Sequence, residues 1–412
     1  MSILAIAYAC EPGKGSEPGA GWSWARALAT IDHTYVITRA NNAGNVERGL
    51  PGIPERDQLT FVFVDLPKWA RFWKKGRRGQ RVYYLLWQIA ALKAARRVRK
   101  QQGFEIVWHL TLANIWMGSL APLAGGRFVF GPVGGGAAAP LKLLPVLGIR
   151  GGLFELAREA TTTLSRYLNP LARLAWRRAE LVLVQNPETR QWMPRRHRQK
   201  AVVFPNALIT VPRTTSPTRS PRKAAPPTML FAGMLLPLKG VYLVIKALEL
   251  LPEWRLIICG TGPDERRLRR LVRRGNVMRR VEFRGWVDRQ ELSALMRDEA
   301  DVFVFPSLHD QGPFAVAEAT AAGLPSVCLD RGGPKLLGGI PVEARFPRAT
   351  ARALATAIVK AREVRPRPLP DRSKQLLRLR QILTDRGLLG PPLSDLPTAE
   401  GPVPGTVGRT PV

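Results

Sequence analysis

Short apolar runs alternate with helical stretches along most of this chain, and this alternation occurs twice. In the first half, the runs that indicate buried strands are 3–9, 34–38, 59–64, 105–109, 127–130, 181–184 and 202–204. In the second half they are 229–232, 255–259, 281–284, 302–305 and 326–329. Strands that alternate with helices are typical of a parallel, doubly wound sheet. The sequence therefore predicts an α/β fold with two such sheets.

A segment rich in Pro, Ser and Thr, residues 212–227, separates the two series of strands. It has no apolar period, which indicates a linker. We expect residues 1–211 and 228–349 to form two Rossmann-like domains that face each other across a cleft. Basic helices are expected at 350–385 and a Pro/Gly-rich, disordered tail at 386–412. Ligands bind beyond the carboxyl ends of such strands, so we expect the site in the cleft.

The charge of the chain favours anionic partners. Lys and Arg number 63 against 31 Asp and Glu, which gives a formal net charge of +32. Nucleic acid, an anionic membrane and phosphorylated substrates all fit this charge. Cys10, Cys259 and Cys328 form no CxxC pair, so we expect buried free thiols in a reducing cytoplasm. No apolar run reaches the ~20 residues of a membrane-spanning helix, and the apolar N-terminus is interpreted as a first strand.

The segment 307–334, SLHDQGPFAVAEATAAGLPSVCLDRGGP, carries two carboxylates eight positions apart. Asp310 is expected in a loop that leads into a helix, Pro313 fits the first helical turn, and Glu318 is expected about one turn inside. Backbone N–H groups near Gly312 are available for an anion or hydroxyl groups. The Glu318 carboxylate can accept hydrogen bonds from vicinal hydroxyls such as those of a ribose.

Two further segments are expected to be loops that lead into the N-termini of helices, and helix N-termini attract anions. The first is GMLLPLKG at 233–240, where Lys239 faces the anion. The second is the glycine-rich segment 11–29, in which Gly19 and Gly21 would let a helix N-terminus approach phosphates.

In order and spacing, these segments resemble the retaining GT-B glycosyltransferases of family GT4, the glycosyl transferases group 1. Asp310 and Glu318 match the carboxylate–seven–Glu signature of that family, and GMLLPLKG is similar to its diphosphate-binding G-R-x-x-x-x-K-G. Other similar segments are IICGTGPDERRLRRLV, VEFRGWVDRQELSALMRDEADVFVFPS, FPNA, HLTLANIWMGSLAPL and GPVGGG. The resemblance spans roughly residues 3–340 and implies the GT-B fold, two Rossmann-like domains around a cleft.

The resemblance also implies a role for each matching residue. Residues implied to bind the donor diphosphate are Gly19, Gly21 and Lys239. Residues implied to bind the donor sugar and ribose are His109, Asp310, Gln311, Gly312 and Glu318. Residues implied to bind the base are Gly260, Trp286 and Val287. The implied catalytic residues are His109, Lys239, Asp310 and Glu318.

The implied reaction moves a sugar from a nucleotide-sugar, a co-substrate, to a saccharide or lipid-linked acceptor, with retention of anomeric configuration. It would serve cell-envelope or exopolysaccharide synthesis. Lys239 and helix N-termini would stabilise the charge on the leaving diphosphate. We expect no metal and no cofactor, because fixed cations serve this purpose and no DxD pair stands at a strand end. The enzyme is expected in the cytoplasm, peripheral on the inner face of the cytoplasmic membrane.

Three positions depart from the family pattern. Met234 stands where the family places an arginine on the diphosphate, and methionine cannot form the bidentate clamp of arginine. Candidates for replacing that arginine are Arg39, Arg331 and Lys335. Asp310 replaces the more usual Glu, and Pro313 removes an N–H from the loop. A protein of the same fold that binds a glycan or partner without catalysis therefore remains an alternative.

Residues 68–100 contain twelve basic residues and no acidic one, with Trp69, Phe72 and Trp73 among the charges. One interpretation is an interfacial patch at 68–81 that holds the enzyme on an anionic membrane. The other is a core helix flanked by a solvated basic loop. Single-stranded nucleic acid also suits aromatic residues among Arg and Lys, but no nucleic-acid-binding module is present, which disfavours it.

Overall fold

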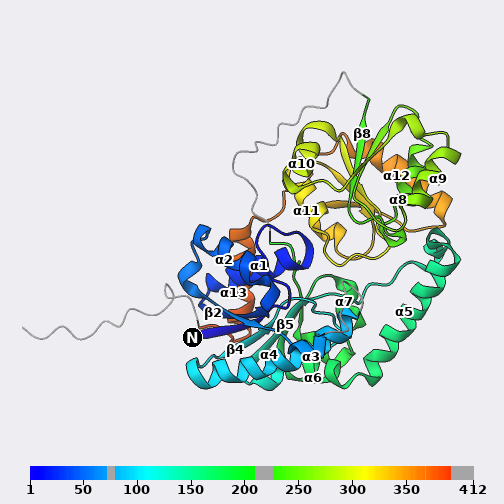
Figure 1. Ribbon diagram of the computed structural model, residues 1–412. Helices are drawn as coiled ribbons and strands as arrows, with labels where there is room; N and C mark the ends of the chain where they lie inside the picture. The colour runs from blue at the N-terminus through cyan, green and yellow to red at the C-terminus, as the bar shows by residue number, and fades with distance from the viewer. Residues whose placement is uncertain (72–78, 209–225, 367, 391–412) are drawn as a thin grey trace, which may run out of the picture.

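The computed structural model describes residues 1–71, 79–208, 226–366 and 368–390, and all structural statements refer to these residues. Figure 1 shows two domains, each built around a sheet with helices packed on it. All pairings between named strands are parallel. The predicted pair of parallel α/β domains is therefore confirmed.

The N-terminal domain contains a seven-stranded sheet with the order β3-β2-β1-β4-β5-β6-β7. Its strands are β1 (Ser2–Ile6), β2 (His33–Arg39), β3 (Leu59–Val64), β4 (Ile106–His109), β5 (Arg127–Val133), β6 (Ala179–Val184) and β7 (Ala201–Val203). Every residue of β4 is buried, and strands covered on both faces read as continuous apolar runs. That pattern is why all seven strands could be predicted.

The helices of this half are α1 (Ser16–Ala29), α2 (Ala43–Gly49), α3 (Lys68–Arg71), α4 (Gln80–Gln102), α5 (Gly148–Leu168), α6 (Pro170–Arg178) and α7 (Pro187–Trp192). Short 3-10 segments are η1 (Ala40–Asn42), η2 (Leu50–Gly52), η3 (Arg56–Gln58), η4 (Ala121–Ala124), η5 (Leu141–Leu147) and η6 (Arg195–Lys200). The basic segment 68–100 contains α3 and α4, while its residues 72–78 lie outside the described part of the chain.

The C-terminal domain contains a six-stranded sheet with the order β10-β9-β8-β11-β12-β13. Its strands are β8 (Thr228–Ala232), β9 (Arg255–Cys259), β10 (Val281–Gly285), β11 (Val302–Phe305), β12 (Ser326–Leu329) and β13 (Gly339–Val342). The sequence did not predict β13, which is four residues long and contains Pro341. Proline is tolerated there because β13 is an edge strand.

The helices of this half are α8 (Val241–Leu248), α9 (Glu265–Arg274), α10 (Arg289–Ala294), α11 (Phe314–Ala321), α12 (Pro347–Ala361) and α13 (Arg372–Asp385). Short segments are η7 (Pro237–Lys239), η8 (Met278–Arg280), the π-turn η9 (Leu295–Glu299) and η10 (Pro334–Leu337). Pro313 was expected in the first turn of a helix, but it precedes α11 at the N-cap position with an extended backbone.

Two segments pack on the other domain than the one formed by their half of the sequence. Leu143 of η5 is buried in the core of the C-terminal domain. Leu379 and Leu383 of α13 are buried in the core of the N-terminal domain, beside which α13 lies in Figure 1. The segment 350–385 contains most of α12 and all of α13. It is not one unit, because α12 packs on the C-terminal sheet and α13 packs on the N-terminal core. These exchanges tie the two domains together.

Candidate functional site

Lys239 and Asp310 meet at the carboxyl edge of the C-terminal sheet. Lys239 ends η7, which follows β8, and Asp310 lies in the loop that follows β11. The Lys239 ammonium donates a hydrogen bond to the Asp310 carboxylate, and it lies 5.3 Å from the centre of the Phe305 ring. Gly240 makes this turn, with φ of 73° and no room for a side chain against the Pro306 carbonyl. Neighbouring strands β8 and β11 therefore bring together two predicted site residues.

The loop after Asp310 lies against the N-terminal domain. The Gln311 side-chain oxygen accepts hydrogen bonds from Asn186 Nδ2 at 2.9 Å and Thr189 Oγ1 at 3.3 Å, near the start of α7. A Cβ on Gly134 would lie 2.7 Å from Gln311 Cγ, so the glycine-rich GPVGGG segment fits closely around this side chain. A Cβ on Gly312 would lie 3.1 Å from the Gln185 side chain. Gln311 and Gly312 are therefore part of the contact between the domains.

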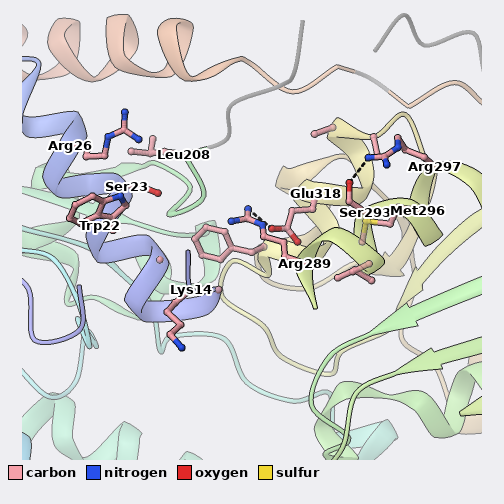
Figure 2. Close-up of a pocket in the computed structure, with 16 residues that line it drawn as sticks. Lys14, Trp22, Ser23, Arg26, Leu208, Arg289, Ser293, Met296, Arg297 and Glu318 are labelled. Atoms are coloured by element: carbon pink, nitrogen blue, oxygen red, sulfur yellow. Dashed lines mark hydrogen bonds and ion pairs between the residues drawn. The ribbon is translucent and has the colours of Figure 1, made fainter. Parts of the chain in front are cut away.

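A cavity of about 400 Å³ lies between the two domains. Figure 2 shows Trp22 and Ser23 of α1 on one side and Glu318 of α11 on the other. Arg289, the first residue of α10, donates a hydrogen bond of 2.6 Å to Glu318. The Glu318 side chain is 24% exposed and that of Arg289 is 64% exposed. Burial raises the pKa of the Glu318 carboxyl, and the Arg289 cation opposes that shift.

Cationic side chains outnumber anionic ones around this cavity. Lys14, Arg26, Arg289 and Arg297 line it, with Glu318 the acidic residue among its described lining. Arg26 is paired with Glu55 at 2.8 Å, which neutralises its charge. The remaining excess of positive charge favours an anionic ligand, because a low-dielectric cleft strengthens such attraction. Sequence reasoning did not select Lys14, Arg289 or Arg297, although Lys14 lies inside the glycine-rich segment 11–29.

Gly19 and Gly21 have different surroundings. Both lie inside α1, which begins at Ser16. Gly19 lines the cavity. Gly21 does not, and a Cβ there would lie 2.0 Å from the Ala9 carbonyl oxygen. A Cβ on Gly19 would lie 2.0 Å from the Lys14 carbonyl oxygen, so both glycines permit a backbone segment to pack closely on α1, and of the two Gly19 also lines the cavity.

His109 at the end of β4 is 1% exposed. Its Nε2 lies 2.7 Å from the Tyr84 hydroxyl and 3.2 Å from the Thr111 carbonyl oxygen, and its Nδ1 lies 2.5 Å from Ser119 Oγ. Burial lowers its pKa to about 4, partly offset by the Thr111 carbonyl. Both ring nitrogens bond inside the domain in this structure, and the expected contact of His109 with a donor sugar stays a prediction.

The residues predicted to hold the base lie at the ends of β9 and β10. A Cβ on Gly260 would lie 1.9 Å from the Gly233 carbonyl oxygen, so only glycine fits there. Trp286 is 76% exposed and Val287 packs at the edge of the C-terminal core. None of the three lines the cavity beside Glu318. Their role in base binding stays a prediction.

The cations proposed to replace the family arginine are engaged elsewhere or lie outside the cavity. The Arg39 guanidinium lies 4.9 Å from the Tyr8 ring centre and 5.3 Å from that of Tyr83. Lys335 is 2.9 Å from Asp330 and 3.5 Å from Glu188. Arg331 follows β12 and does not line the cavity. Arg289 and Lys14 line the cavity, whereas Lys239 and Asp310 do not.

The remaining predictions concern thiols, metals and membranes. The three cysteines are buried free thiols, as predicted. Within the described ranges, His, Cys, Asp and Glu side chains form no cluster of three or more that could hold a metal. None of the described helices combines the length and apolar character needed to cross a bilayer.

Comparison with known proteins finds matches to parts of this chain. Residues 212–337 match the family model for glycosyl transferases group 1. The putative colanic acid biosynthesis glycosyltransferase WcaL of Escherichia coli K12 is 30% identical over 242 residues, which is 55% of this chain. The corresponding Salmonella typhimurium protein is 29% identical over 248 residues. The matched part spans 58% and 59% of the length of these two relatives.

Solved structures resemble the whole fold. A sucrose-phosphate synthase from Thermosynechococcus elongatus superposes with a TM-score of 0.60 at 16% identity, covering 94% of this chain and 99% of that one. HepE from Anabaena, solved in complex with UDP and glucose, has a TM-score of 0.56 at 17% identity and covers 93% of this chain and all of its own. Together with the two parallel sheets, these likenesses confirm the predicted GT-B fold.

Proposed function

We propose that this chain, which has a GT-B fold and whose residues 212–337 match the family model for glycosyl transferases group 1, is a glycosyltransferase using a nucleotide-sugar donor. The proposed acceptor is a saccharide or a lipid-linked saccharide, in the synthesis of an envelope or extracellular polysaccharide. The E. coli and Salmonella relatives are named for colanic acid biosynthesis, which supports that setting. UDP and glucose bound to HepE support the donor class.

The observation that carries the proposal is the Lys239–Asp310 pair at the adjoining ends of β8 and β11. Without an anionic ligand, the carboxylate balances the lysine charge. A donor diphosphate would compete for the same ammonium, and charge-assisted hydrogen bonds of this kind are the strong ones. As the bond to the sugar breaks, negative charge grows on the diphosphate and Lys239 would stabilise it. Fixed cations would thereby serve without a metal ion.

Glu318 is the proposed ribose contact on the other side of this loop. Its Oε1 is held by Arg289, which is mostly exposed and so can move. Ribose hydroxyls would donate to the carboxylate, while Arg289 would turn toward the phosphates in the cationic cavity. Retention of anomeric configuration is the stereochemistry we propose for the transfer. Gly19, at the cavity wall on α1, is proposed to lie beside the donor diphosphate.

A cytoplasmic location and peripheral attachment to the inner membrane face are further parts of the proposal. The support is the basic segment 68–81, in which the described Trp69 is exposed beside Lys68. Residues 72–78 of that patch lie outside the described residues. Vesicle co-sedimentation of a variant with neutralised Lys and Arg in 68–81 tests this part. Unchanged sedimentation would remove the patch from the proposal.

The test of the donor site is calorimetric titration of UDP, GDP and ADP, and of their sugars, into wild type and Lys239→Ala. We expect one nucleotide to bind and the variant to lose at least about tenfold in affinity, about 1.4 kcal/mol. Lys246→Ala is the matched control, because Lys246 is also on the C-terminal domain but pairs with Glu249 of its own helix end. Lys239→Met serves as a second variant that removes the charge and keeps a side chain of similar length. Product analysis by NMR, with and without a chelator, then tests retention and metal independence.

A second candidate is a protein of this fold that binds a glycan or partner without catalysis. Met234, Asp310 and Pro313 favour it, because each departs from the donor-binding pattern. If the folded wild-type protein binds no nucleotide or nucleotide-sugar, this candidate replaces the enzyme. Nucleic-acid binding is disfavoured, and absence of a gel shift at physiological salt would dispose of it.

A further inference from the structure

Helix α5 turns an apolar face to solvent that the proposed transfer reaction does not use. Seven of the 23 exposed large apolar side chains among the described residues lie on this helix: Ile149, Leu153, Phe154, Leu156, Leu164, Tyr167 and Leu168. Positions 149, 153, 156, 164 and 167 repeat at helical spacing, so they form one stripe. Five turns separate the first from the last, a length of about 27 Å. Contiguous exposed apolar surface of this kind marks an interaction site.

Polar contacts on the opposite side fix the rotation of the helix. Glu155 is buried, accepts hydrogen bonds of 2.9 and 2.6 Å from Arg158, and lies 3.2 Å from His309 Nε2 in the C-terminal domain. Turning the apolar stripe inward would expose this group of charges and bury others. Figure 1 shows α5 on the outside of the molecule, reaching from one domain to the other. The stripe therefore faces outward as a stable feature.

The charges around α5 indicate what kind of partner its apolar face binds. Residues 141–178 contain seven Lys and Arg against two Glu, one of which is the inward Glu155. The exposed basic residues of this segment include Lys142, Arg150, Arg173, Arg177 and Arg178. A second copy of this chain, also at +32, would be repelled, whereas anionic lipid headgroups would be attracted. We propose that the outer face of α5 docks on the surface of an anionic lipid bilayer.

Neighbouring elements extend the surface. Val82, Leu85, Leu86 and Ile89 of α4 are exposed on one side of that helix, and Trp69 of α3 is exposed. α5 contacts α6, and both α6 and α4 contact η4. In Figure 1, α3, α4, α6 and the far end of α5 lie at the same end of the molecule. An amphipathic helix lying in the bilayer interface with basic residues beside it is a known mode of peripheral binding. This docking does not depend on the identity of the transfer reaction.

The test is co-sedimentation of the full chain with vesicles of phosphatidylcholine alone and of phosphatidylcholine mixed with phosphatidylglycerol. Wild type is expected to bind the anionic vesicles, more weakly as salt is raised. The triple variant Leu153→Gln/Leu164→Gln/Leu168→Gln is expected to lose at least about tenfold in partition. The matched control is Met278→Gln/Val359→Gln/Leu377→Gln, three exposed apolar residues on other elements, and it should bind within about twofold of wild type.

Circular dichroism and light scattering accompany the experiment. Both variants should keep the wild-type spectrum and mass, because all six side chains are exposed. Wild type that binds neither vesicle, or an α5 variant that binds like wild type, would overturn the proposal. So would a wild-type dimer that the α5 variant dissociates, because the stripe would then belong to a contact between copies. An equal loss in the control variant would show a general effect of surface polarity and overturn it too.

Discussion

The two domains share one architecture but differ at the carboxyl edges of their sheets. In the N-terminal domain, His109 at the end of β4 bonds to Tyr84 and Ser119 and is buried. In the C-terminal domain, Lys239 and Glu318 keep part of their side chains accessible. This difference shows that a position at the end of a strand fixes where a residue lies but not its role. Whether that residue binds a ligand or completes a core depends on what packs above it.

The largest expected effect is a loss of stability when the contact of α13 with the N-terminal domain is removed. Leu379 and Leu383 of α13 are fully buried in the N-terminal core. The double variant Leu379→Ala/Leu383→Ala should lower the free energy of unfolding by about 4 kcal/mol or more, since each buried Leu→Ala change costs roughly 2–5 kcal/mol. Chemical denaturation followed by tryptophan fluorescence measures it. Leu377→Ala on the exposed side of the same helix is the control, and equal effects would contradict this assignment.

The burial of His109 at the edge of the N-terminal sheet predicts that the free energy of unfolding depends on pH. Because the pKa of His109 is lowered from 6.5 to about 4 in the folded state, the unfolded chain binds a proton first as pH falls. The stability from the neutral ring should be present above about pH 6.5 and lost between 6.5 and 4, by about 3 kcal/mol at most. The variant His109→Gln should lack this part of the pH dependence. If it instead matches wild type in pH profile and loses donor affinity, the N-terminal edge is a binding edge.

The accessible edge is tested through Glu318. Glu318→Gln should reduce donor affinity or kcat/KM by roughly 10- to 100-fold, because hydrogen bonds to a charged group contribute roughly 1.5–3 kcal/mol. Stability should change little, since the Arg289 partner is mostly exposed. Arg289→Gln keeps the carboxylate but removes both the ion pair and the proposed phosphate contact, so a smaller loss than in Glu318→Gln would assign the difference to the carboxylate. A Glu318 variant with wild-type kinetics would show that this carboxylate does not contact the donor.

The smallest expected effect is a gain in nucleotide affinity when a positive charge is added at position 234 of the C-terminal domain. Met234→Arg restores the family pattern beside Lys239 and should strengthen nucleotide binding by up to about tenfold, because arginine can contact phosphates bidentately. Calorimetry with the nucleotide that binds wild type measures it. Met234→Leu is the control for side-chain volume. No gain in affinity would indicate that residues of the cavity, such as Arg289, already supply the charge.

The sequence by itself determined most of the fold and the loops of the site. Buried parallel strands read as apolar runs, so every strand but β13 was predicted, and β13 was missed because a short edge strand with Pro341 lacks that signal. The strand-to-helix motifs located Lys239, Asp310 and Glu318 correctly at the carboxyl edge of their sheet. Such signals are local, because strand, turn and helix preferences act over a few residues.

Only the tertiary structure decided which of these residues meet. The Lys239–Asp310 pair, the Arg289–Glu318 pair and the burial of His109 all depend on elements packed from distant parts of the chain. The return of α13 to the first domain and the outward apolar face of α5 likewise have no local signal. Helical spacing gives a helix an apolar face, but the surrounding elements decide whether a core covers that face. Long-range packing therefore decides which sheet edge stays partly accessible and which is buried in two domains of the same architecture.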